Sequence, residues 1–249
     1  MPISERQTAA PTSAQSSLDG YWYQLKVSVL FALDLLANKQ QTDQIILEPA
    51  SEEDLYTELD GEVSALTQGF NLRTKKLIVQ CKLRNTGPWK INEIRSLLAH
   101  GTKRKPAKEM LKDADAHYLL VTSADLNGVA RKLSVSGPTQ WSQLKPMPPR
   151  LKGDLPHGAD GRVAVWNSLD QEKVEHRIVD RLTERFRLPR SRVQACIKQL
   201  EEGALMRMKG SQAGVWTRQE IIGIVEAHGG YDGVSKDLSQ FVQPANWDD

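Results

Sequence analysis

The chain has 249 residues, of which 39% are hydrophobic and 26% charged, and its formal net charge is +2. This composition is ordinary for a globular protein and excludes a strongly basic nucleic-acid binder, so any basic surface must be local. It contains no run of about 18 apolar residues, so we expect no transmembrane helix. The only two cysteines, Cys81 and Cys196, provide no disulfide framework and favour a reducing, cytoplasmic location.

The first half of the chain alternates helical and strand patterns. Residues 1–17 are polar and lack the apolar stretch of a signal peptide, so we expect a disordered lead-in. A helix is predicted next, with Asp19 as its N-cap. Strands are predicted at 43–49 ("DQIILEP"), 52–59 and 75–83 ("KKLIVQCKL"). A helix at 89–101, a strand at 116–124 and a helix at 125–133 complete this half.

These elements predict an α/β fold with a mixed sheet between helices over residues 18–133. Residues 134–160 are rich in proline and glycine, which predicts a linker. Residues 161–249 are mainly helical. A helix with apolar residues at every fourth position, a second helix ended by Gly203, a hairpin at 204–217 and a helix capped by Thr217 and Glu220 give the outline of a winged-helix-like second domain.

Two polar side chains interrupt the strongest predicted strand. Gln80 and Lys82 share one face, about 7 Å apart along the strand. Upstream, Glu48, Glu53 and Asp54 belong to a cluster of acids. Carboxylates of this kind hold hard cations such as Mg²⁺, which polarise a phosphoryl oxygen and activate water, while a lysine neutralises developing charge.

The spacing Asp54…Gln80-Cys81-Lys82 resembles the core of the PD-(D/E)xK nuclease superfamily in its QxK variant. Together with "GYWYQLKVSVLFALDLL" and "YLLVTSA", it is similar to the double-stranded-DNA endonuclease domain of CD-NTase-associated (CBASS) antiphage effectors and of STAND-type antiviral NTPases. The resemblance covers roughly residues 18–133. It implies a restriction-endonuclease-like fold, a Mg²⁺ or Mn²⁺ cofactor and hydrolysis of DNA phosphodiesters.

The resemblance also assigns roles to residues. It implies catalytic roles for Asp54, Gln80, Lys82 and Gln24, and a metal held by Asp54, Gln80, Glu48 and Glu53. This sequence departs from the family pattern in lacking the Pro-Asp dipeptide. In addition, Glu53 and Asp54 are adjacent, so the strand register decides which of them points inward.

Structural roles compete with these assignments. Lys82 could be a strand-end lysine that reaches solvent, and Gln80 could pair with a neighbour on an edge strand. Gln24 could be a half-buried amide that bonds to the backbone.

Two basic segments are candidates for DNA contact. Arg177, Arg181 and Arg185 recur every fourth residue, and Lys103, Arg104 and Lys105 form a second basic stretch. Acids between the arginines also allow a solvated face, and a winged-helix outline also suits protein contact or oligomerisation.

The combined hypothesis is a metal-dependent endonuclease that degrades double-stranded DNA without sequence specificity in antiphage defence. We expect it to act as a homo-oligomer, with a missing NTPase or sensor module as a possible partner and no membrane association. The alternatives are a non-catalytic DNA-binding or oligomerisation module and an RNA nuclease.

Overall fold

The computed structural model describes residues 13–38, 41–48, 54–59, 75–100, 106–141, 144–210 and 214–231. Its centre is a six-stranded sheet in the order β5-β4-β3-β2-β1-β6. The strands are β1 (Gln44–Leu47), β2 (Leu55–Leu59), β3 (Lys75–Lys82), β4 (Ala116–Thr122), β5 (Val163–Trp166) and β6 (Val215–Thr217). The α-helices are α1 (Ser13–Phe31), α2 (Ile91–Ala99), α3 (Ala107–Met110), α4 (Pro149–Lys152), α5 (Gln171–Asp180), α6 (Arg190–Met208) and α7 (Arg218–Ala227).

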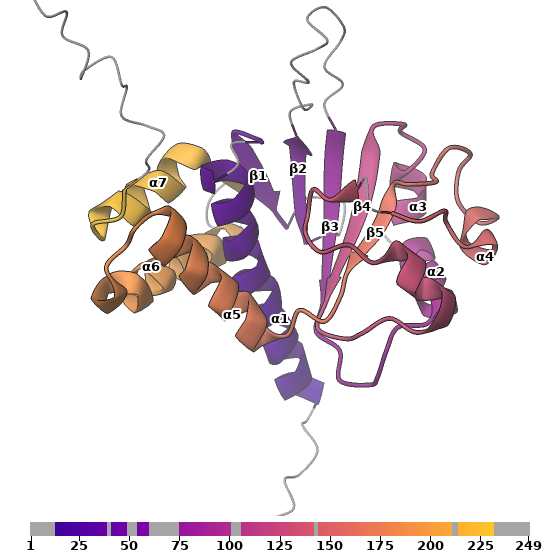
Figure 1. Ribbon diagram of the computed structural model, residues 1–249, viewed down its shortest axis with the longest axis horizontal. Helices are drawn as coiled ribbons and strands as arrows, with labels where there is room; N and C mark the ends of the chain where they lie inside the picture. Colours follow the sequence, from indigo (N-terminus) through magenta and orange to yellow (C-terminus); the bar gives the residue numbers. More distant parts are fainter. Residues whose placement is uncertain are drawn as a thin grey trace, which may run out of the picture.

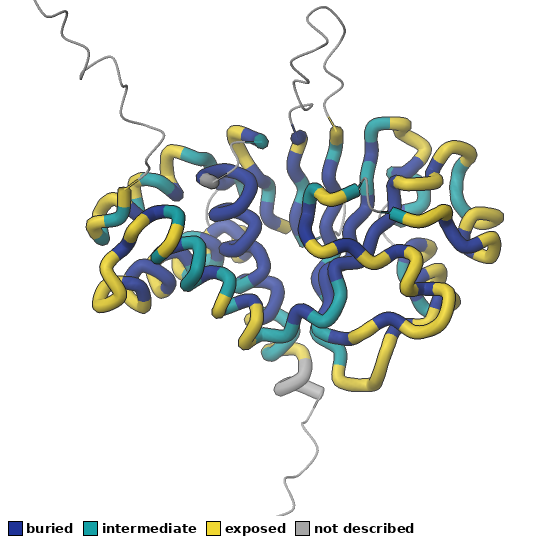
Figure 2. Tube along the Cα trace, viewed as in Figure 1, coloured by how far each residue is buried: buried dark blue, intermediate teal, exposed yellow. Residues whose placement is uncertain are grey.

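Helices cover both faces of this sheet. Figure 1 shows α1, α5, α6 and α7 on one side and α2, α3 and α4 on the other. Successive residues of a strand point to opposite faces. Leu77 and Val79 of β3 enter the core under α1, α5, α6 and α7, which we call the first core. Ile78 enters the core under α2, α3 and α4, which we call the second core. The buried trace in Figure 2 follows the strands and α1 through the middle of the molecule. The near-continuous apolar run of β3 is therefore explained by burial on both faces.

The sheet is mixed. β3 pairs in parallel with β4, and β4 pairs in parallel with β5, whereas β1, β2, β3 and β6 are joined by antiparallel pairings. Parallel neighbours require crossover connections, and α2 with α3 supplies the one between β3 and β4.

Three further segments adopt tighter or wider helical turns. α1 continues into the π-helix η1 (Ala32–Asn38), and α5 continues into the π-helix η4 (Arg181–Arg185). The segment predicted as a helix at 125–133 forms the 3₁₀-helix η2 (Gly128–Leu133). π-helical turns inside α-helices are rare, and η1 and η4 contact one another.

Much of the predicted element order is confirmed. β1 to β4 and α2 occupy the predicted segments, which confirms a mixed α/β sheet flanked by helices. The apolar stripe of the helix after residue 170 is buried, and Thr217 with Glu220 forms the predicted capping box of α7. The restriction-endonuclease-like and winged-helix details are not confirmed by the fold itself.

Three predicted features are wrong. α1 begins at Ser13 and not after Asp19, because no glycine or proline breaks the helix between them. α6 continues through Gly203 to Met208, so the predicted hairpin is replaced by helix and a single strand. A Cβ at Gly203 would lie 3.5 Å from the Trp216 ring, an ordinary contact distance, so this glycine neither ends the helix nor is required by packing.

The residues after the predicted linker are joined to those before it. β5 pairs with β4 and β6 pairs with β1, so both halves of the chain build one sheet. The first core likewise contains side chains of α1 together with those of α5, α6 and α7. The predicted boundary at residue 161 therefore falls within a shared sheet. In the described part of the chain, no helix has the length and apolarity needed to cross a membrane.

Candidate functional site

Glu48, Asp54 and Gln80 lie in a row across β1, β2 and β3. The β2–β3 register pairs Leu55 with Val79, and just before β2 the Asp54 backbone N–H donates to the Val79 carbonyl over 3.1 Å, so Asp54 lies beside this part of β3. The backbone N–H of Glu48 donates to the carbonyl oxygen of Asp54 over 3.1 Å, which continues the β1–β2 ladder by one residue. These contacts bring Glu48, Asp54 and Gln80 to one end of the sheet, where Glu48 bonds to α1 and Gln80 bonds to Tyr118 of the second core.

Glu48 connects this row to α1. Its backbone has φ of 49°, in the left-handed region, so the extended conformation of β1 breaks there. Its Oε1 accepts a hydrogen bond from Gln24 Nε2 over 2.6 Å, and Gln24 is buried on α1. The structure thus brings together two predicted site residues that are 24 positions apart in the chain.

The Asp54 carboxylate lies in a poorly solvated position. Burial raises its pKa from the ordinary 3.8 to about 6; the nearby Glu48 charge acts in the same direction. The hydrogen bond that Asp54 Oδ2 accepts from the backbone N–H of Cys81, at 2.5 Å, and the charge of Lys82 oppose this shift. Asp54, Glu48 and Lys82 therefore share one electrostatic environment.

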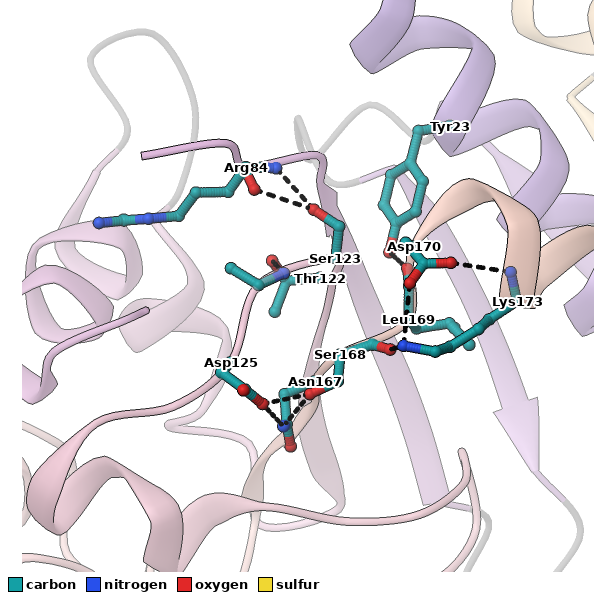
Figure 3. A network of polar contacts seen from close by, with 11 residues as sticks. Tyr23, Arg84, Thr122, Ser123, Asp125, Asn167, Ser168, Leu169, Asp170 and Lys173 are labelled. Carbon is teal, nitrogen blue, oxygen red and sulfur yellow. Dashed lines mark hydrogen bonds and ion pairs between the residues drawn. The ribbon is translucent and has the colours of Figure 1, made fainter. Parts of the chain in front are cut away.

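Lys82 ends β3, and neighbouring strands fix its backbone. Its carbonyl oxygen accepts a hydrogen bond from Thr122 Oγ1 at 2.8 Å. Two residues on, Ser123 Oγ accepts from the backbone N–H of Arg84 at 2.8 Å and donates to the Arg84 carbonyl at 3.2 Å. Figure 3 shows the two contacts between Arg84 and Ser123. They fix the ends of the two strands relative to each other.

The same view shows how the end of β5 is held. Asp125 accepts hydrogen bonds from Ser168 Oγ and, at 3.2 Å, from Asn167 Nδ2. Tyr23 of α1 donates to the carbonyl oxygen of Leu169 at 2.8 Å. These polar groups satisfy one another, so we assign this network to positioning the strand ends.

Gln80 has a described partner on β4. Its Oε1 accepts a hydrogen bond from the Tyr118 hydroxyl at 2.6 Å. A carbonyl oxygen has a second lone pair, so this contact orients the amide and leaves one acceptor position for another group. The predicted role of Gln80 as a metal ligand stays a prediction.

Sequence reasoning missed Tyr21, one turn before Gln24 on α1. Its ring packs against the first core, and its pKa is raised by partial burial and by the Glu48 charge. Residues three positions apart share a helix face, so the spacing from Gln24 was the available signal. Besides the Gln24 hydrogen bond, this charge effect is the second interaction of Glu48 with a side chain of α1.

The two carboxylates of Asp54 and Glu48 are oxygen ligands of the kind that hard divalent cations use. Among the described residues, no group of three or more His, Cys, Asp or Glu side chains could hold a metal ion. Mg²⁺ commonly uses one or two protein carboxylates and completes its octahedron with water and ligand phosphates. Asp54 and Glu48 supply two carboxylates of this kind, and the Glu48 charge is the smallest influence on the pKa of Asp54, after burial, the Cys81 hydrogen bond and the Lys82 charge. The residues therefore fit Mg²⁺ or Mn²⁺ that is shared with a phosphate ligand.

The arginine stripe is largely engaged within the protein. The Arg177 guanidinium lies 5.2 Å from the Trp166 ring centroid, and that of Arg185 lies 5.7 Å from the ring of its neighbour Phe186. Arg181 forms an ion pair with a buried aspartate of η1. These contacts give the predicted stripe a packing role. Glu53, Lys103, Arg104 and Lys105 lie outside the described residues.

No protein-family model and no curated protein matches the sequence. Solved structures do match. Cap4 SAVED/CARF-domain containing receptor of Acinetobacter baumannii with the cyclic trinucleotide 3'3'3'-cAAA has a TM-score of 0.52 at 11% identity, over 94% of this chain and 48% of that one. The same receptor with 2'3'3'-cAAA has a TM-score of 0.50 at 11% identity, over 88% and 45%. This chain spans about half the length of these structures.

At this identity the likeness shows the fold alone. The neighbours are nevertheless described as SAVED/CARF-domain containing receptors, two of them with a cyclic trinucleotide, and not as nucleases. The predicted membership of the PD-(D/E)xK nuclease superfamily and the predicted DNA endonuclease activity are contradicted by this finding. Double-stranded DNA as the partner is contradicted with them, because the molecule found with these neighbours is a cyclic trinucleotide. The short D…QxK spacing was too weak a signal to fix a reaction.

Proposed function

We propose that this chain is a ligand-binding module of a receptor, and that its site binds a phosphodiester-bearing nucleotide together with Mg²⁺ or Mn²⁺. The observation that carries the proposal is the cross-strand row in which Asp54 and Glu48 lie side by side with Lys82 in the same electrostatic environment. Antiviral signalling is the setting that we propose for the receptor, in a reducing cytoplasm that suits the two free cysteines.

Charge supports a phosphate ligand. Asp54 and Glu48 would hold the divalent cation, which would neutralise their two negative charges, and Lys82 would add a positive charge. A phosphate would then offset this positive charge and supply further oxygen ligands. Lysine binds phosphate as a point charge and needs no fixed geometry, which suits a residue at the end of a strand.

The neighbours support the choice of nucleotide. Two of them hold adenine cyclic trinucleotides, so the first ligand to test is 3'3'3'-cAAA. Its phosphodiesters carry the chemistry that the row is proposed to bind. Gln24 orients Glu48 and the Cys81 N–H orients Asp54, so these two carboxylates would hold the cation, which would supply positive charge for the phosphate.

Isothermal titration calorimetry of the full chain with 3'3'3'-cAAA tests the proposal, with Mg²⁺ or with EDTA. We expect binding with Mg²⁺ and its loss in EDTA. Lys82→Ala is expected to weaken binding roughly tenfold or more, because it removes a charged contact to phosphate. Lys75→Ala is the matched control, since Lys75 is exposed at the opposite end of the same strand. It should bind as the unchanged protein does.

Two results would overturn the proposal. The first is a failure of the binding test: the unchanged protein does not bind the ligand, or it binds equally well in EDTA. The other is recovery of linear or shortened products from the titration cell, which would mean that the site does more than bind. Chromatography of the recovered ligand distinguishes the second result from simple binding.

A further inference from the structure

We propose that a cavity on the second-core face of the sheet binds a purine base. The cavity has a volume of about 620 Å³ and lies between β2, β3 and the segment that runs from α3 into β4. Small-molecule sites commonly enclose roughly 300–1,000 Å³, so there is room for a base. This inference rests on the proposed function for the choice of a nucleotide, but it needs neither the cation nor the phosphate of that proposal.

The floor of the cavity is apolar and comes from two neighbouring strands. Tyr56 of β2 is paired directly with Ile78 of β3, so their side chains lie side by side on the same face of the sheet. Ile78 is buried in the second core, and Tyr56 and Met110 pack against that core. An aromatic ring and a thioether are both favourable partners for the face of a flat aromatic ligand.

The wall of the cavity is held in place by a buried arginine. Arg162 donates to the backbone carbonyl oxygens of Asp113 at 2.6 Å and Ala116 at 2.8 Å, and both of these residues line the cavity. Arg162 also donates to the carbonyl oxygen of Leu111 at 2.9 Å. These bonds fix the segment between α3 and β4, so a ligand that enters the cavity has little of the protein to order.

Two ion pairs give the rim of the cavity both donors and acceptors. Lys76 Nζ bonds to Asp113 Oδ2 at 2.8 Å, and Lys112 pairs with Glu109. The Lys76 hydrogen bond lowers the pKa of Asp113, so this carboxylate stays ionised at neutral pH. An ammonium group has three N–H donors and a carboxylate has several acceptor positions, so an ion pair of this kind can also bond to a ligand.

The charge balance of the rim indicates the class of ligand. Two lysines and two acids give these four side chains no net charge, so an anionic ligand would meet carboxylates and a cationic ligand would meet ammonium groups. A purine base is neutral, has two flat aromatic faces and carries nitrogen acceptors beside N–H donors on its edge. It therefore matches the apolar floor and the mixed rim at the same time.

The cavity lies on the face of β3 that also carries Lys82. Ile78 and Lys82 are four residues apart, so they share this face at a separation of about 13 Å along the strand. A base in the cavity and a phosphate at Lys82 can therefore belong to one trinucleotide.

Isothermal titration calorimetry of the full chain with adenosine in EDTA tests the inference, because adenosine has no phosphate and EDTA removes divalent cations. We expect a Kd of roughly 0.1–1 mM, which is ordinary for a ligand of this size. Tyr56→Leu should weaken binding roughly three- to tenfold, because it removes the stacking ring and keeps apolar bulk. Met110→Trp should abolish binding, because the larger side chain fills the cavity.

Tyr56→Phe is the matched control, since the Tyr56 hydroxyl bonds to Glu58 at 2.9 Å and only the ring is assigned to the cavity. It should bind adenosine as the unchanged protein does, and ribose, which lacks the base, should not bind. Melting temperatures identify a variant that has lost its fold, and the other variant then decides.

Three results would overturn this inference: no binding of adenosine by the unchanged protein, equal binding of ribose, or full affinity in a folded Tyr56→Leu or Met110→Trp variant. None of them touches the Mg²⁺-dependent binding of 3'3'3'-cAAA, so the proposed function stands or falls by its own titration.

Discussion

Asp34 and Arg181 form an ion pair, with Arg181 Nε 2.5 Å from Asp34 Oδ1, that joins the two π-helical segments η1 and η4. Only 4% of the Asp34 side chain is exposed, against 30% for Arg181. The two residues are 147 positions apart in the chain, so this pair links the end of α1 to the end of α5. A buried carboxylate that loses its partner is costly, because its desolvation is no longer offset.

We therefore expect Arg181→Leu to lower the free energy of unfolding by about 3 kcal/mol. Arg181→Leu with Asp34→Asn should recover much of that loss, because the buried charge is removed as well. Urea unfolding at pH 7 measures both values. Equal losses in the single and double variants would show that Asp34 is not stabilised by the arginine.

Asp54 is expected to make stability depend on pH. Its folded-state pKa, about 6, lies above the ordinary 3.8, so the folded state binds the proton more tightly than the unfolded state does. The resulting stabilisation is fully present below about pH 4 and is lost as pH rises through 6, up to about 3 kcal/mol in total. Asp54→Asn should remove this dependence and raise the melting temperature at pH 8.

Thermal unfolding of the two proteins between pH 4.5 and pH 8 measures this effect. The exposed Glu202→Gln on α6 is the control and should follow the unchanged protein. An Asp54→Asn variant with the same pH profile as the unchanged protein would place the carboxyl in water and contradict the burial described here.

Divalent cations should stabilise the protein in a way that depends on the same carboxylates. Mn²⁺ that binds only the folded state raises the melting temperature, and deprotonated carboxylates bind it better. We expect a larger rise at pH 7.5 than at pH 5, and its loss in Glu48→Gln and Asp54→Asn. Differential scanning fluorimetry over a range of Mn²⁺ concentrations measures this, with Glu202→Gln again as control. A rise of equal size in the Asp54→Asn variant would place the cation elsewhere.

Gly214 is expected to tolerate no side chain. A Cβ at this position would lie 2.5 Å from the Leu47 carbonyl oxygen, where the backbone of Leu47 also donates to the Gly214 carbonyl at 2.8 Å. Gly214→Ala should lower the free energy of unfolding by roughly 2–4 kcal/mol, because backbone atoms cannot move aside as a flexible side chain does.

Gly223→Ala on α7 is the matched control. Its Cβ would meet nothing within 4 Å, and alanine should stabilise the helix by about 0.5–1 kcal/mol. Urea unfolding that ranks the two variants in the opposite order would contradict the β1–β6 contact.

The local pattern of apolar and polar residues predicted most helices and strands, but it predicted little of how they pack together. The runs that became β3 and β4, the stripe from Val174 to Phe186 and the Thr217 capping box are local signals, and each was confirmed. β5 was missed because "VAVW" is short and follows a proline- and glycine-rich segment. Gly203 was assigned to a helix end because glycine often ends helices, whereas here α6 continues through it to Met208.

The candidate site was likewise predicted in its local parts and not in its three-dimensional arrangement. The sequence placed Gln80 and Lys82 on one strand and identified the acids upstream. It could not supply the hydrogen bonds that set Asp54 against Val79 and Cys81, nor the left-handed backbone of Glu48 that accompanies its contact with Gln24. The family resemblance supplied a reaction that the comparisons contradict, since D…QxK states spacing and not chemistry.

The pairing of β6 with β1 has a consequence for synthesis on the ribosome. Ile45 leaves the exit tunnel long before its partner Trp216 has been made. At roughly 5–20 residues per second, the nascent chain carries β1 with one unsatisfied edge for about 10 to 30 seconds. An apolar edge strand that waits this long is open to pairing with other chains, so we expect production of this protein to be sensitive to temperature and to the supply of chaperones.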